Sequence, residues 1–329
     1  MQTDTIINGD WVDVLKTMPD CSVHCGVTSP PYYGLRDYGV DGQLGLEETP
    51  GEYIEKLVVG FREFRRVLSD DGTLWINIAD CYAGSGKCRN SDGEVNQSIY
   101  SAKQGTNRGS ASGVLTKTKL HNIKPKDLIG IPWMLAFALR NDGWYLRSEI
   151  IWNKPNAMPE SVTDRCTSAH EIIFMLAKSR NYYFDMNAIK EPAVNGDPNP
   201  PRGSKGAITE NQGRRKQDSI GKRRYTGFNE RYFDGTAREH RNKRNVWTVS
   251  TKPLKESHFA TFPVDLIEPC ILAGCPERGI VCDPFFGSGT TGVAAKKHNR
   301  HYVGIELNPE YIKIAQERLF HATAQQKLF

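Results

Sequence analysis

The sequence predicts an α/β fold with a mainly parallel sheet, and three observations support that prediction. Apolar segments with the length of strands alternate along the chain with segments whose apolar residues recur at helical spacing. Residues 280–307 have the pattern of one complete βαβ unit, with a glycine-rich turn before its helix. The longest apolar stretch, residues 129–139, contains glycine and proline and is shorter than the roughly 20 residues of a membrane span.

The amino-terminal half supplies the first predicted elements. Residues 22–27 are expected to form a strand that ends at TSPPYYG, because two prolines stop a strand. Apolar side chains at i, i+3 and i+4 intervals predict a helix over residues 51–68. A turn at Asp70–Gly72 is expected to precede the buried strand TLWINIA. A second helix is predicted over residues 126–141, with Gly143 placed to end it.

The carboxyl-terminal half continues the alternation. The segments WYLRSEIIW and EIIFMLA are predicted strands. A helix is predicted over residues 262–273, with Pro263 in its first turn and Gly274 after its end. The strand IVCD, the loop PFFGSG, the helix TTGVAAKKH, the strand HYVGIEL and the helix PEYIKIAQERLF follow in order.

The net charge of +5 is unevenly distributed along the chain. Residues 191–250 hold 13 Lys or Arg against 7 Asp or Glu, and residues 82–124 hold 7 against 2. These stretches therefore carry +6 and +5, and the rest of the chain carries −6. Both are rich in Gly, Ser, Asn and Pro, which predicts long loops. They are either solvated surface or nucleic-acid-binding segments, and the Tyr, Phe and Trp among the cations of residues 191–250 favour nucleic acid.

The βαβ unit of residues 280–307 has features of a cofactor site. Asp283 ends its first strand, Gly287 and Gly289 lie in the turn, and Glu306 ends the next strand, 19 residues after Gly287. An acidic residue at about this distance can bind both hydroxyls of a ribose. Glycines also serve merely to make such turns tight, so the pattern leaves both interpretations open. The third glycine of the dinucleotide fingerprint is absent, which favours a mononucleoside-like cofactor over NAD.

The turn Thr28-Ser29-Pro30-Pro31-Tyr32 can bind an exocyclic amine. Proline lacks an N–H group, so carbonyls in a Pro-Pro turn are free to accept hydrogen bonds from a ligand. Ser29 adds a side-chain acceptor, and Tyr32 adds a flat ring that can stack on a base. A rigid surface turn with a buried tyrosine is the alternative interpretation.

Three apparent motifs are incomplete. Positions 81 and 88 are both cysteine, which excludes a phosphate-binding loop around the GSGK at 84–87. His170-Glu171 would need a histidine at position 174 to form a zinc-protease motif, and position 174 is phenylalanine. The eight cysteines include no CxxC pair, so no metal site is predicted.

TSPPY near the amino terminus combined with DPFFGSGTT near the carboxyl terminus resembles the DNA amino-methyltransferases, and the order of these motifs is that of their beta class. The resemblance covers residues 6–80, 126–185 and 253–320. It implies a Rossmann-like methyltransferase fold with a mainly parallel twisted sheet, helices on both faces and an inserted basic DNA-recognition region. It also implies S-adenosyl-L-methionine as cofactor and transfer of its methyl group to cytosine N4 or adenine N6.

The resemblance assigns the site residues. The catalytic residues are Ser29, Pro30, Pro31 and Tyr32. The cofactor-binding residues are Asp283, Phe285, Phe286, Gly287, Ser288, Gly289, Thr290, Glu306 and Asn308, with His258, Phe259 and Thr261 from KESHFATFP. The segment IIWNKPNAMPES resembles the family segment that holds the target base, and it nominates Trp152, Asn153 and Lys154. Arg223, Arg224, Arg231, Arg241, Lys243 and Arg244 are the expected DNA contacts, mostly to phosphates.

The implied reaction needs no metal and no cysteine nucleophile. Ser29 and the Pro30 carbonyl would accept the two amine hydrogens of a flipped base, Tyr32 would stack on it, and the methyl group would transfer directly. Within the family, SPPY favours cytosine N4 and DPPY favours adenine N6, so cytosine is expected and adenine is the alternative. An RNA or protein amine methyltransferase and a non-catalytic DNA-binding regulator are further alternatives.

The expected organisation is a catalytic and cofactor-binding domain of residues 1–185 and 251–329, which includes the basic loop 82–124. Residues 186–250 are the expected target-recognition insert. Double-stranded DNA is the expected partner, and the resemblance adds a homodimer and a cognate restriction endonuclease. The first residues, MQTDTIINGDW, lack a basic start and an apolar core, so a cytoplasmic protein of bacterial, archaeal or phage origin is expected.

Overall fold

The chain is described by a computed structural model over residues 1–34, 39–83, 123–193, 240–252 and 262–326. Two compact units are distinguished, Met1–Ala188 with Arg244–Phe329 and, separately, Ile189–Lys243. In the described part of the second unit, β6 (Glu191–Pro192) pairs with β7 (His240–Arg241) in antiparallel orientation. A short 3-10 helix, η3 (Asn187–Ile189), lies where the units join in sequence.

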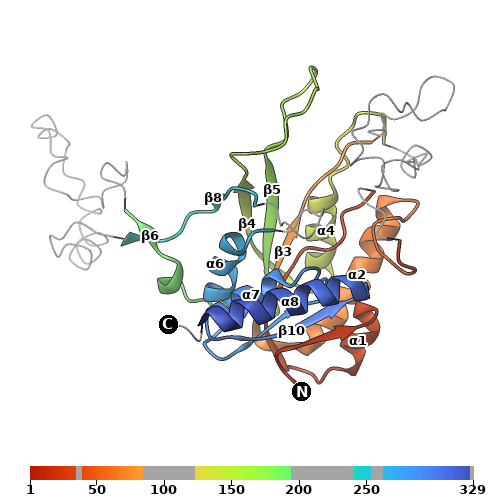
Figure 1. The fold of residues 1–329 in the computed structure, drawn as a ribbon. Helices are drawn as coiled ribbons and strands as arrows, with labels where there is room; N and C mark the ends of the chain where they lie inside the picture. Colours follow the sequence, from red (N-terminus) through yellow and green to blue (C-terminus); the bar gives the residue numbers. More distant parts are fainter. Residues whose placement is uncertain (35–38, 84–122, 194–239, 253–261, 327–329) are drawn as a thin grey trace, which may run out of the picture. The chain divides into compact units, whose positions relative to one another are not determined.

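The larger unit is built on one mixed sheet, which in the described residues has the order β1-β10-β9-β2-β3-β5-β4-β8 (Figure 1). Only β5 runs antiparallel to its neighbours, and the other pairs are parallel. The mainly parallel sheet predicted from the sequence is therefore confirmed. The strands are β1 (Thr5–Asn8), β2 (Val23–Thr28), β3 (Leu68–Ile78), β4 (Tyr145–Asn153), β5 (His170–Ala177), β8 (Val246–Thr248), β9 (Ile280–Asp283) and β10 (His301–Glu306).

The helices pack in two groups, as the contacts between elements show. The first group comprises α1 (Trp11–Thr17), α2 (Pro50–Val67) and α4 (Ile131–Asn141), in which α2 contacts both others. The second comprises α6 (Val264–Gly274), α7 (Thr290–Lys297) and α8 (Pro309–Gln326), in which α7 contacts both others (Figure 1). Each group covers sheet strands with apolar side chains, which is the layered arrangement of an α/β fold.

The start of α2 illustrates how local sequence fixes an element. Thr49 Oγ1 accepts a hydrogen bond from the Glu52 amide at 3.2 Å, and the Glu52 carboxylate accepts one from the Thr49 amide at 3.3 Å. This capping box satisfies two amides that the helix cannot, and Pro50 suits the first turn because it lacks an N–H. The helix then buries Phe61 and Phe64 completely.

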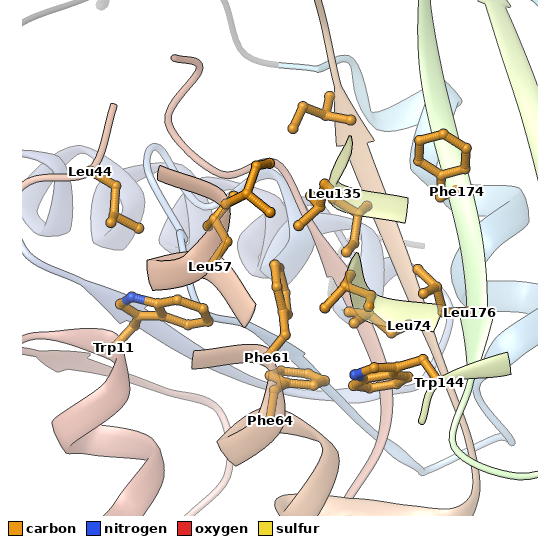
Figure 2. Close-up of a cluster of buried hydrophobic side chains, with 14 of the residues drawn as sticks. Trp11, Leu44, Leu57, Phe61, Phe64, Leu74, Leu135, Trp144, Phe174 and Leu176 are labelled. Carbon is orange, nitrogen blue, oxygen red and sulfur yellow. The ribbon is translucent and has the colours of Figure 1, made fainter. Parts of the chain in front are cut away.

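A cluster of buried apolar side chains lies between the first helix group and the sheet (Figure 2). Trp11 of α1 meets Phe61 edge-on, with ring centroids 5.2 Å apart. Gly60 provides the space for this contact, because a Cβ there would lie 2.0 Å from the Trp11 ring. The cluster members labelled in Figure 2 are Trp11, Leu44, Leu57, Phe61, Phe64, Leu74, Leu135, Trp144, Phe174 and Leu176.

Two boundaries predicted from the sequence are wrong. The helix predicted from residue 126 begins only at Ile131, because the Asp80 carboxylate accepts hydrogen bonds from the Gly130 and Ile131 amides and so caps the helix there. Before the helix, Leu128 instead forms an antiparallel β-bridge with Tyr82, which lies shortly after β3. The predicted turn at Asp70–Gly72 is a bulge inside β3, where the register against β2 shifts.

Candidate active site

The predicted catalytic turn and the predicted cofactor loop lie at the same edge of the sheet. Strand β2 ends at Thr28, just before Ser29, and its neighbour β9 ends at Asp283. The next strand, β10, ends at Glu306. All three strands are parallel, so their carboxyl ends, where ligands of such sheets bind, lie side by side.

Asp283 links the two loops directly. Its Oδ1 accepts a hydrogen bond from Thr28 Oγ1 at 2.6 Å, and its Oδ2 accepts one from Thr291 Oγ1 at 2.6 Å. The Phe285 amide donates a third hydrogen bond to Oδ1 at 3.0 Å. Asp283 is 1% exposed, and this burial raises its pKa to about 6, against the lowering effect of the three hydrogen bonds. In this geometry the carboxylate holds the catalytic strand and the glycine loop together.

The two glycines of the loop differ in their surroundings. Both have positive φ angles, +51° at Gly287 and +80° at Gly289, a region that side chains disfavour. A Cβ at Gly289 would lie 2.9 Å from the Ala315 Cβ of α8, so this glycine permits close packing inside the protein. A Cβ at Gly287 would meet nothing nearer than the Phe285 carbonyl oxygen at 3.9 Å. Gly287 therefore leaves open space of the kind that a bound cofactor can use.

Glu306 lies next to that space. Its Oε2 accepts a hydrogen bond from the Gly287 amide at 2.7 Å, and its Oε1 accepts one from the Asn308 amide at 2.8 Å. Burial raises the pKa of Glu306, and these amides oppose the rise. Asn308 in turn uses its Oδ1 to accept from the Glu310 amide at the start of α8. The carboxylate retains lone pairs for a further donor such as a ribose hydroxyl.

The remaining predicted residues of the loop are largely inside the protein. Phe286 is 3% exposed and stacks on Tyr302 with ring centroids 5.6 Å apart. Ser288 and Thr290, both 4% exposed, accept hydrogen bonds through their hydroxyl oxygens from Arg318 of α8, at 2.6 and 3.2 Å. Sequence reasoning missed Arg318, because a cation in an amphipathic helix has no local feature that marks it as a loop support.

The catalytic turn is fixed from several sides. The Pro31 carbonyl accepts a hydrogen bond from Tyr53 of α2 at 2.7 Å, whereas in the described residues the Pro30 carbonyl has no hydrogen-bond donor. Tyr32 Oη lies 2.7 Å from Glu171 Oε2, 3.1 Å from Asn77 Oδ1 and 3.4 Å from Ser29 Oγ. Neither Glu171 nor Asn77 was predicted as a site residue.

The segment nominated for target-base binding lies at the end of β4 and directly after it. Trp152 is 3% exposed, and its indole N–H donates to the Val249 carbonyl at 2.8 Å, the placement of a buried strand residue. Asn153 donates through Nδ2 to Thr248 Oγ1 at 3.1 Å. Lys154 forms an ion pair with Glu171, and its Nζ lies 4.3 Å from the Trp152 ring centroid. Only Lys154 of the three approaches the catalytic turn, through Glu171.

Three of the predicted DNA contacts are described but are divided between the two units, and the other nominated residues are not described. Arg241 belongs to the second unit, where its Nε donates to Glu191 Oε1 at 2.9 Å. Lys243 ends that unit and Arg244 begins the following segment of the first. The other nominated residues, which lie outside the described residues, are His258, Phe259, Thr261, Arg223, Arg224 and Arg231.

Within the described residues, no group of three or more His, Cys, Asp or Glu side chains could hold a metal ion. Cys282 precedes Asp283, and its complete burial raises the pKa of its thiol well above the usual value. That thiol is therefore not a ready nucleophile at neutral pH. No helix in the described part of the chain has the length and apolarity needed to cross a membrane.

Comparison with known proteins identifies the family. A family model described as DNA methylase, of the N6 and N4 type, matches residues 23–317. The type II methyltransferase M.Cfr9I of Citrobacter freundii is 47% identical over 315 residues, which cover 96% of this chain and 87% of that protein. The type II methyltransferase M.SmaI of Serratia marcescens is 45% identical, over 95% of this chain and 90% of that protein.

Solved structures support the fold. The PvuII DNA methyltransferase (cytosine-N4-specific) aligns over 96% of this chain and 86% of its own, with a TM-score of 0.60 and 15% identity. A DNA modification methylase of Thermus thermophilus, solved with S-adenosyl-L-methionine, aligns over 96% of this chain and 93% of its own, with a TM-score of 0.53 and 21% identity. The family and the Rossmann-like fold predicted from TSPPY and DPFFGSGTT are thereby confirmed. The chain belongs to the N6/N4 DNA methylase family and is a type II DNA methyltransferase that uses S-adenosyl-L-methionine.

Proposed function

We propose that this enzyme methylates the N4 amine of cytosine in duplex DNA. The observation that carries the proposal is the neutral hydroxyl of Ser29 at the head of the turn, in the position where an aspartate would favour adenine N6. Ser29 lies next to the Pro30 carbonyl, which has no donor in the described residues. Together they offer one acceptor for each hydrogen of an exocyclic amine.

The turn would activate the amine by orientation and electrostatics. The lone pair of an exocyclic amine is delocalised into the ring, so the amine is a poor nucleophile. Hydrogen bonds from its two N–H groups to Ser29 Oγ and the Pro30 carbonyl would localise that lone pair toward the methyl donor. The nitrogen would then bond to the methyl carbon as the carbon–sulfur bond breaks, with the neutral thioether as the leaving group, and it would release its extra proton to solvent. Tyr32 would stack on the base, which must be flipped out of the duplex.

The residues at the ends of β9 and β10 fit the cofactor. When bound, S-adenosyl-L-methionine supplies an electrophilic methyl group on a sulfonium. We assign contact with it to the open side of Gly287 and to the Glu306 carboxylate, which is partly shielded and retains lone pairs. Asp283 has a supporting role in this proposal, because both of its oxygens already bind threonine hydroxyls. It would hold the cofactor loop against the catalytic strand.

The wider setting follows from the DNA substrate. We propose that residues 189–243, whose sequence is basic, contribute to recognition of the target sequence through phosphate and base contacts. A homodimer, a cognate restriction endonuclease and action in the cytoplasm remain part of the proposal. The description of the relatives as type II methyltransferases favours the restriction partner.

Identification of the modified nucleoside tests the proposed base. Unmethylated duplex DNA is incubated with the enzyme and methyl-labelled S-adenosyl-L-methionine, digested to nucleosides and separated by mass spectrometry. We expect N4-methyldeoxycytidine. Label in N6-methyldeoxyadenosine instead would overturn the proposal for cytosine.

A further inference from the structure

We propose that Glu171, neutralised by Lys154, is a positioning residue that fixes Tyr32 and directs the Ser29 hydroxyl proton away from the target amine. This inference rests on the proposed roles of Ser29 and Tyr32. In the sequence, Glu171 belongs only to the incomplete zinc-protease motif that begins at His170. Four neighbouring strands, β2, β3, β5 and β4, bring these side chains together.

The sheet topology explains how these residues meet. Glu171 lies at the start of β5, which is antiparallel to both β3 and β4. Asn77 lies near the end of β3, and Lys154 directly follows β4. Because β5 runs the opposite way, its beginning lies at the edge where its neighbours end. Tyr32 reaches the same edge from β2, on the other side of β3.

Counting protons gives the direction of each hydrogen bond. A tyrosine hydroxyl has one proton. Three side-chain oxygens lie beside Tyr32 Oη, and of these Glu171 Oε2 and Asn77 Oδ1 can only accept, whereas Ser29 Oγ can also donate. The carboxylate is closer, at 2.7 Å against 3.1 Å, and hydrogen bonds to an ionised acceptor are the stronger kind. Tyr32 therefore donates to Glu171, which fixes the ring at its hydroxyl end.

This direction determines what Ser29 can do. With the Tyr32 proton committed to Glu171, a lone pair of Tyr32 Oη can accept from Ser29 Oγ, 3.4 Å away. A serine that donates its one proton there presents lone pairs, and no proton, to the substrate. A Ser29 proton pointing at the amine nitrogen would instead occupy the lone pair that must attack the methyl group. Through Tyr32, the Glu171 carboxylate thus orients Ser29 so that its oxygen accepts a hydrogen bond from the target amine.

Lys154 stabilises the shielded carboxylate. The side chains of Glu171 and Lys154 are only 12% and 18% exposed, and an ionised group so shielded is costly unless it is paired. Lys154 pairs with Glu171 and also lies over the Trp152 ring, at 4.3 Å from its centroid. Trp152 and Lys154 would therefore act on the base indirectly, through Glu171.

The test is a double-mutant cycle of Glu171→Gln and Tyr32→Phe, with single-turnover label transfer to DNA and DNA affinity as readouts. Each single variant loses the same charge-assisted hydrogen bond, so we expect the transfer rate to fall about 10- to 100-fold in each, with DNA affinity changed less than about threefold. The double variant should be no slower than the slower single variant. Glu268→Gln is the matched control, because Glu268 is similarly shielded, at 18%, and pairs with Lys297 away from the turn.

Two outcomes would overturn the inference. One is transfer by Glu171→Gln at a rate close to that of the native enzyme, and the other is multiplication of the two defects in the double variant. If Glu171→Gln fails to fold because Lys154 is left unpaired, Glu171→Gln combined with Lys154→Met removes both charges, and it should fold yet transfer slowly. The assay counts label on any base, so methylation of adenine would refute the cytosine proposal and leave this test valid.

Discussion

Replacement of Asp283 by asparagine should stabilise the protein increasingly as the pH rises. The folded-state pKa of Asp283 is about 6, against 3.8 for the free side chain, because the carboxyl is buried. An acid with a raised folded pKa binds protons more readily when folded, so its ionisation costs stability. The loss of stability begins near pH 4, where the carboxyl of the unfolded chain starts to ionise. It reaches its full value of about 3 kcal/mol above pH 6, where the folded carboxyl is ionised as well.

The introduced asparagine would not ionise and could still bond both threonine hydroxyls, accepting from one and donating to the other. The free energy of unfolding of Asp283→Asn, relative to the native protein, should therefore increase by about 1 kcal/mol between pH 5 and pH 8. Reversible denaturant unfolding at intermediate pH values measures this difference. Asp13→Asn, at a carboxylate whose side chain is 77% exposed, controls for loss of one negative charge. A difference that stays constant with pH, or declines, would refute the reasoning.

Further predictions address the cofactor loop, the catalytic turn and the basic segments. Gly287→Val fills the open side of the loop and should weaken S-adenosyl-L-methionine binding about tenfold or more, measured by calorimetry; unchanged affinity would place the cofactor elsewhere. Tyr32→Ala and Pro30→Ala should abolish methyl transfer while cofactor binding stays measurable, and loss of binding in both would mean that their roles are misassigned. DNA affinity should fall steeply with salt, because two basic stretches hold +11 of charge, and a salt-independent affinity would refute their role.

The βαβ unit shows what the sequence could predict. Its strands, its glycine turn and its helix all have local patterns, and β9, α7 and β10 were predicted within a residue or two. The parallel sheet also implies that Ser29 and Asp283 lie at one edge, because each follows or ends a strand at its carboxyl end, whereas the pairing of β2 with β9 depends on the strand order. These features depend on short-range spacing and on general rules of sheet topology.

The missed features depend on contacts between distant segments. The start of α4 is set by Asp80, 50 residues earlier in the chain, and no local residue marks it. Glu171 gains its position only because β5 runs antiparallel between β3 and β4. Likewise, β8 joins β4 from within the stretch predicted as the insert. Such pairings are fixed by tertiary packing and cannot be read from the periodicity of one segment.

The central claim is that Ser29 and the Pro30 carbonyl accept the two hydrogens of a flipped target amine. A crystal structure of the enzyme with S-adenosyl-L-methionine and its target duplex measures this directly, through the distances from the amine nitrogen to Ser29 Oγ and to the Pro30 oxygen. We predict an extrahelical cytosine on the Tyr32 ring, with both distances at about 3 Å. A flipped base whose amine lies beyond hydrogen-bonding reach of both oxygens would contradict the account.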